Sequence, residues 1–125
     1  MTSASTTTTV DGVIDRVRKV YGSWRRDTTV AQMRQDWDQL FGGVPVDADI
    51  EDVDAGGVQA QWVGAPGADP RRAILYFHGG GFQVGSVVSH RELMAGLSAA
   101  AQCRVLGVDY RLAPEHRYPA ALDDA

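Results

Sequence analysis

The sequence has 125 residues, of which 44% are hydrophobic and 22% are charged, and these proportions indicate a folded globular domain rather than a disordered chain. The formal net charge of −4 at pH 7 argues against a nucleic-acid-binding surface. Cys103 is the only cysteine, which excludes a disulfide within one chain and a cysteine zinc site, and its apolar neighbours predict a buried core thiol.

The first nine residues are expected to form a disordered tail. They are mostly small and hydroxylated, and they lack the basic and apolar regions of a secretory signal. No stretch approaches the roughly 18 apolar residues that a membrane-spanning helix requires. We therefore expect a cytoplasmic protein without a membrane or nucleic-acid partner.

Residues 10–44 are predicted to form two amphipathic helices. Apolar residues recur at intervals of three and four from Val10 to Trp24, and again from Val30 to Phe41. Thr29 and Gln32 form a capping box at the start of the second helix. Two such stripes with bulky aromatic residues cannot bury each other completely. The helices therefore either pack on a sheet as ordinary core or cover a substrate pocket as a lid.

Short β-strands are predicted after Pro45. Residues 50–53 and 58–63 are β-prone runs around a glycine-containing turn, which is the pattern of a hairpin. A third strand, at residues 73–77, alternates little between apolar and polar, so it should be covered on both faces.

A βαβ unit is predicted from this third strand onward. Ser89 and Glu92 form a capping box for a helix that ends near Gln102. Residues 104–110 follow as another strand. The strands on either side of the helix should therefore be parallel, with a right-handed crossover.

The third strand opens directly into His78 and three consecutive glycines. A dinucleotide-binding fingerprint would need a glycine where Val84 stands, and a P-loop would need a nearby lysine. The histidines at positions 78, 90 and 116 lack metal-ligand spacing. Backbone N–H groups of a glycine loop can instead stabilise the oxyanion that forms when a carbonyl is attacked. Each such donor is typically worth about 3 kcal/mol at the transition state.

Residues 78–82, and residues 109–121 with the sequence Asp-Tyr-Arg-Leu-Ala-Pro-Glu-His-Arg-Tyr-Pro-Ala-Ala, are two separate motifs. They resemble the hormone-sensitive-lipase branch (family IV) of the α/β-hydrolases, and among its members the bacterial short-chain carboxylesterases and lactone hydrolases. The resemblance implies an α/β fold with residues 45–125 as the N-terminal part of its core. It also implies that residues 10–44 belong to a helical cap, and that no metal or cofactor is needed.

The resemblance implies a role for each residue of the glycine loop. The N–H groups of Gly80 and Gly81 would be the oxyanion-hole donors, with His78 and Gly79 supporting the loop. His78 would not be the catalytic base, because the family's catalytic histidine follows the serine and the acid along the chain. Phe82 would either line the substrate pocket or pack under the loop.

Three charged residues near the second motif are predicted to have a structural role. Asp109, Arg111 and Glu115 carry opposite charges close together in the sequence. We expect them to form ion pairs that lock the loop from Tyr110 to Pro119 beside the site.

The nucleophile of this family is missing from the sequence. No Gly-x-Ser-x-Gly occurs, and neither Ser86 nor Ser98 lies in such a setting. The sequence also stops within a helix that begins at Pro119, and the strand at residues 104–110 would be left with an unpaired apolar edge.

These features predict the N-terminal fragment of a serine carboxylester hydrolase, inactive by itself. The parent enzyme would hydrolyse a short- to medium-chain ester or lactone through an acyl-enzyme, and it could form a homodimer. The alternative is a catalytically inactive remnant or a subunit completed by another chain.

Overall fold

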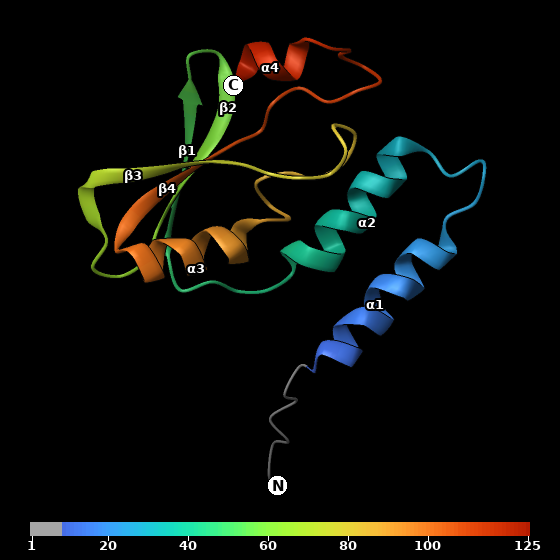
Figure 1. Ribbon diagram of the computed structural model, residues 1–125, viewed down its shortest axis with the longest axis horizontal. Coiled ribbons are helices and arrows are strands. Elements are labelled where there is room, and N and C mark those ends of the chain that lie inside the picture. The colour runs from blue at the N-terminus through green and yellow to red at the C-terminus, as the bar shows by residue number, and fades with distance from the viewer. Residues whose placement is uncertain (1–8) are drawn as a thin grey trace, which may run out of the picture.

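The structure is a computed structural model, and it describes residues 9–125. Within these residues, two N-terminal helices precede a mixed β-sheet that is flanked by two further helices (Figure 1). The helices are α1 (Val10–Ser23), α2 (Val30–Gly42), α3 (Arg91–Ala101) and α4 (Ala120–Asp124), and the strands are β1 (Asp49–Ala55), β2 (Val58–Gly64), β3 (Asp69–Phe77) and β4 (Cys103–Val108).

The sheet formed by residues 9–125 has the strand order β1-β2-β4-β3. β1 and β2 form an antiparallel hairpin that turns at Gly56 and Gly57, both of which have positive φ. β3 and β4 are parallel and joined through α3. The predicted hairpin and βαβ unit are confirmed.

The prediction that the strand at residues 104–110 has a free edge is wrong. β4 pairs with β3 on one side and with β2, antiparallel, on the other. Within the described part of the chain, the edge strands are β1 and β3. The order of strands depends on contacts between distant residues, which a local sequence pattern does not contain.

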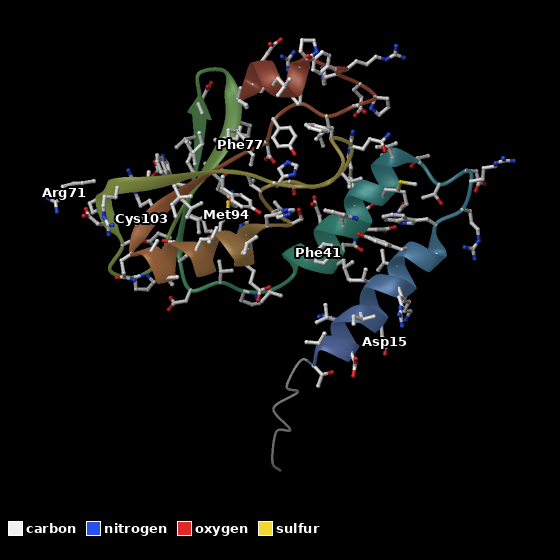
Figure 2. The ribbon with its side chains drawn as sticks, in the orientation of Figure 1. Asp15, Phe41, Arg71, Phe77, Met94 and Cys103 are labelled. Atoms are coloured by element: carbon white, nitrogen blue, oxygen red, sulfur yellow. The ribbon has the colours of Figure 1, made fainter. Side chains whose placement is uncertain are left out.

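One face of the sheet packs against α3. Met94 of α3 is fully buried against Val63 of β2, Val105 of β4 and Val87, and Ile74 adds to this cluster from β3. Figure 2 shows Met94 between α3 and the sheet. Cys103 is also buried, as predicted.

The opposite face of the sheet is covered less completely. Ala60, Val108 and Tyr110 form a second buried cluster next to α4. Leu75 and Phe77 of β3, however, are 57% and 42% exposed. The prediction that this strand is covered on both faces is therefore wrong for the described residues, because among them α3 covers one face and little covers the other.

Threonine side chains cap the two N-terminal helices. Thr9 Oγ1 accepts a hydrogen bond from Gly12 N at 3.1 Å, and Thr29 Oγ1 accepts one from Gln32 N at 3.1 Å. Thr9 therefore belongs to the helix cap, and residues 1–8 of the predicted tail lie outside the described residues. The capping box at Thr29 is half formed, because the side chain of Gln32 donates to Asp36 instead.

The predicted capping box at Ser89 is wrong. α3 begins at Arg91, and its N-terminus has no side-chain cap. Ser89 Oγ accepts from Ser86 N and donates to Ser86 O, both at 3.0 Å. The hydroxyl closes a turn before the helix and is not available as its cap. Among residues 9–125, no helix combines the length and the apolar character needed to cross a bilayer.

Candidate functional site

The glycine loop leaves the C-terminal end of β3 and reverses at once. Gly80, Gly81 and Phe82 all have positive φ, at 136°, 63° and 61°. The N–H groups of Gln83 and Val84 both donate to the carbonyl oxygen of Gly80, at 3.2 and 3.1 Å. These two bonds close the turn.

The glycines of this loop are not equivalent. A Cβ on Gly80 would lie 1.9 Å from the carbonyl oxygen of Val84, so no other residue fits there without moving the backbone. A Cβ on Gly79 would meet no atom within 4 Å. The turn therefore requires glycine at position 80 and does not require it at position 79.

The glycine loop lines an apolar cavity at the end of β3. Among the described residues, the N–H groups of Gly79, Gly80 and Gly81 donate to no protein acceptor. The cavity has a volume of about 310 Å³. It is lined by Phe77, His78, Gly79, Gly80, Gly81, Phe82, Tyr110, Ala121, Leu122 and Ala125. Unpaired donors beside an apolar space are suited to bind an oxygen that gains negative charge.

His78 and Tyr110 lie together under the loop. The His78 side chain is buried, and its ring stacks on that of Tyr110 with centroids 4.4 Å apart. The Tyr110 hydroxyl donates to the carbonyl oxygen of His78, and burial raises the pKa of Tyr110. The phenol therefore stays protonated as a donor at neutral pH. These contacts hold the backbone at the start of the loop.

Phe82 lies between two apolar cavities. Its side chain is 60% exposed, and it lines both the glycine-loop cavity and a neighbouring one of about 350 Å³. The second cavity lies against Ala113, Pro119 and Leu122. This position favours the pocket-lining interpretation of Phe82 over packing under the loop.

Asp109, Arg111 and Glu115 do not pair with one another, so the predicted ion pairs among them are wrong. Asp109 Oδ1 accepts a hydrogen bond from Val87 N at 2.9 Å, and burial raises the pKa of its carboxyl. Arg111 binds Asp124 of α4 at 3.0 Å. All three residues have partners outside this loop instead.

Glu115 pairs with Arg34 of α2. The Arg34 guanidinium makes two contacts with the carboxylate, one of them between Nη2 and Oε1 at 3.0 Å. This hydrogen bonding lowers the pKa of Glu115 to about 2. The sequence did not indicate Arg34, because it lies 81 residues from its partner.

The hydroxyls of Ser86 and Ser98 are both engaged in hydrogen bonds. Ser98 is fully buried, and its Oγ accepts from Ala65 N and donates to the carbonyl oxygen of Cys103. Ser86 Oγ donates to Asp38 Oδ1 at 2.6 Å. Across residues 9–125, no group of three or more His, Cys, Asp or Glu side chains is arranged to hold a metal ion.

Residues 74–125 match a protein family described as having the alpha/beta hydrolase fold. The order of elements and the parallel βαβ unit agree with this match, so the chain has the N-terminal part of the α/β-hydrolase fold. An esterase from the bacterial hormone-sensitive lipase (HSL) family, known from its crystal structure, is 40% identical. It superposes with a TM-score of 0.85 over 91% of this chain and 38% of that one.

Two further relatives are known from their sequences. An acetyl-hydrolase of Streptomyces hygroscopicus is 44% identical over 89 residues, which are 70% of this chain and 28% of that protein. The esterase LipI of Mycobacterium tuberculosis is 52% identical over 52 residues, which are 42% of this chain and 16% of that protein. The chain is thus similar to an esterase of the bacterial hormone-sensitive lipase family, the family that its motifs resemble, and it spans well under half the length of these relatives.

Proposed function

We propose that the chain supplies the oxyanion-hole part of a serine carboxylester hydrolase, with the N–H groups of Gly80 and Gly81 as donors. The observation that carries this proposal is the row of unpaired N–H groups along the apolar cavity at the end of β3. The backbone turn keeps these donors in place before any substrate binds. Little free energy is therefore needed to reorganise them during the reaction.

The donors would act on the tetrahedral intermediate. Attack of a serine hydroxyl on the ester carbonyl carbon forms a C–O bond and moves the carbonyl electron pair onto oxygen. Two N–H groups can donate hydrogen bonds to that alkoxide, and the low polarity of the cavity strengthens both bonds. The base would take the serine proton during the attack. On collapse the carbonyl double bond re-forms, the bond to the alkoxy group breaks, and the base would return the proton to that group, which leaves as the alcohol.

The serine, the acid and the base would come from residues outside this sequence, since no Gly-x-Ser-x-Gly occurs within it. We expect the 125-residue chain alone to hydrolyse p-nitrophenyl acetate no faster than buffer, without a burst of p-nitrophenol. The names of the relatives, acetyl-hydrolase and esterase, support an ester with a small acyl group as the substrate class. A burst would show that the chain contains a nucleophile after all.

The oxyanion role is tested in the protein that carries the nucleophile. Gly80→Ala keeps its N–H group, but its Cβ would lie 1.9 Å from the Val84 carbonyl oxygen and so would displace the backbone of the turn. We expect kcat to fall by about 10²–10³-fold, the cost typical of losing one oxyanion donor. Gly79→Ala is the matched control, because its Cβ meets no atom, and its kcat should stay within about tenfold of wild type. Thermal unfolding of both variants checks that the fold survives. Equal kcat values for the two variants would mean that Gly80 does not contribute to stabilising the oxyanion.

The coding sequence beyond residue 125 decides between this proposal and the alternative. An in-frame Gly-x-Ser-x-Gly followed by an aspartate and a histidine would support a complete hydrolase. A stop codon would favour a catalytically inactive remnant, or a subunit that another chain completes.

A further inference from the structure

One face of α2 lies along the segment that follows the glycine loop. Arg34, Asp38 and Gly42 are spaced by four residues, so they line the same side of the helix. They meet Gln83, Ser86 and Val88 in turn, in the same order along the chain. Figure 1 shows α2 beside the loop that joins β3 to α3.

Arg34 makes the first of these contacts. Its Nε donates to the carbonyl oxygen of Gln83 at 2.7 Å, and its Nη2 donates to the carbonyl oxygen of Ala113 at 2.9 Å. The remaining donors bind the carboxylate of Glu115. One guanidinium therefore holds the turn after Gly80 against the loop after β4.

The two loops that Arg34 joins are linked directly by one further bond. Ala113 N donates to the carbonyl oxygen of Phe82 at 2.8 Å. Phe82 follows Gly81 immediately, so this bond and the Arg34 contacts fix the same few residues. A lysine could not replace the arginine, because its single ammonium group lacks the planar fork that reaches three acceptors at once.

The other two contacts fix the position of the helix along the segment. Asp38 Oδ1 accepts the hydrogen bond from Ser86 Oγ, and a Cβ on Gly42 would lie 2.9 Å from the Val88 carbonyl oxygen. The backbone of α2 is thus in direct contact with residue 88. Among the described residues that line the glycine-loop cavity, none belongs to α1 or α2.

We infer that Arg34 is a positioning residue for the oxyanion loop. It holds the carbonyl oxygens of Gln83 and Ala113 together and so keeps the turn that presents the N–H groups of Gly80 and Gly81. α2 contacts the loop at residues 83, 86 and 88, none of which lines the cavity. This inference rests on the proposed function, which assigns the glycine loop as the oxyanion hole. It adds that Arg34 holds this loop in its conformation.

Amide hydrogen exchange on the whole 125-residue chain tests the inference, because it needs no ester hydrolysis. In Arg34→Gln, the amides of Gln83 and Ala113 should exchange about tenfold faster than in wild type, as expected for local opening after loss of one charge-assisted contact. The amide of Asp109, which donates to Gln59 O at 2.9 Å, is the internal reference and should not change.

Two further variants complete the experiment. Arg34→Lys should recover part of the protection, since an ammonium can still donate to one or two of the acceptors. Arg18→Gln, at an exposed arginine on α1, should leave every amide unchanged. If Arg34→Gln does not fold, Arg34→Lys carries the test, with faster exchange expected at the same two amides.

Two results would overturn the inference. Equal acceleration at Asp109 would mean that Arg34 supports global stability alone, and wild-type exchange at Gln83 and Ala113 in both variants would mean that it does not hold the turn. Both readouts are independent of catalysis. Failure of the proposed function would instead appear as unchanged kcat in Gly80→Ala.

Discussion

Asp109, the residue after β4, shows how burial changes the pKa of a single side chain. Its carboxylate accepts a hydrogen bond from Val87 N, and burial raises its pKa because the charged form loses hydration. A carboxyl whose pKa is raised by folding binds more protons in the folded state. The folded state therefore loses stability as the pH rises from the ordinary carboxyl range through the raised pKa.

We therefore predict that Asp109→Asn is at least as stable as wild type at pH 7. The amide keeps an oxygen that accepts from Val87 N and removes the buried charge. Urea unfolding at pH 7 and at pH 3 should show this difference in the free energy of unfolding shrink at the lower pH, where both side chains are neutral.

Asp109→Ala is the control for the hydrogen bond at position 109. It should cost about 1–3 kcal/mol at both pH values, because Val87 N is left without an acceptor. A wild type that exceeds the asparagine variant in stability at pH 7 would mean that the carboxylate has a compensating charge partner.

The charged residues of the second motif show what could not be predicted at the residue scale. Asp109, Arg111 and Glu115 are close in the sequence, which suggested that they pair. The partners of Arg111 and Glu115 lie 13 and 81 residues away, on α4 and α2. Local spacing predicts helix neighbours well, whereas a loop residue finds its partner through the tertiary fold.

Ser98 joins three elements of the structure. It lies on α3 with no exposed surface. Its Oγ accepts from Ala65 N, just after β2, at 2.8 Å, and donates to the carbonyl oxygen of Cys103, at the start of β4, at 2.6 Å. The hydroxyl satisfies two backbone groups in the interior of the chain.

We predict that Ser98→Ala destabilises the chain by about 1–3 kcal/mol, the range for leaving buried polar groups without partners. Thermal and urea unfolding measure the change. Ser23→Ala is the matched control, because Ser23 Oγ donates to Val20 O at an exposed helix end, and its effect should stay within about 0.5 kcal/mol. A negligible cost at Ser98 would show that the two backbone groups find other partners.

At the scale of elements, periodicity predicted most of the structure. The helices α1 (Val10–Ser23) and α2 (Val30–Gly42), the hairpin and the parallel βαβ unit follow from spacings within single segments. The cap of α3 did not follow, because Ser89 has a competing local partner in Ser86. The sequence predicted that the glycine loop folds back, but not the hydrogen bonds that close it. Those bonds, from the N–H groups of Gln83 and Val84 to Gly80 O, depend on the backbone angles of the turn.

At the scale of the whole molecule, the order of the strands decides which surface stays open. The sequence suggested that the strand at residues 104–110 would be the edge, but β2 folds back onto β4 and leaves β3 as an edge of the described sheet. β3 also exposes Leu75 and Phe77 on the face opposite α3. Both the backbone and the side chains of this strand are thus available for contact.

An apolar strand with a free edge tends to pair with another copy of itself. We predict that the 125-residue chain associates reversibly as its concentration rises from micromolar to millimolar, and that Leu75→Lys reduces this association because a charged side chain on an edge strand opposes pairing. Sedimentation velocity measures the average mass at each concentration. Leu93→Lys is the matched control, since Leu93 is 51% exposed and belongs to α3, not to the β3 edge strand. An equal reduction by both variants would point to general surface hydrophobicity, and a wild-type chain that stays monomeric throughout would show that β3 is protected in solution.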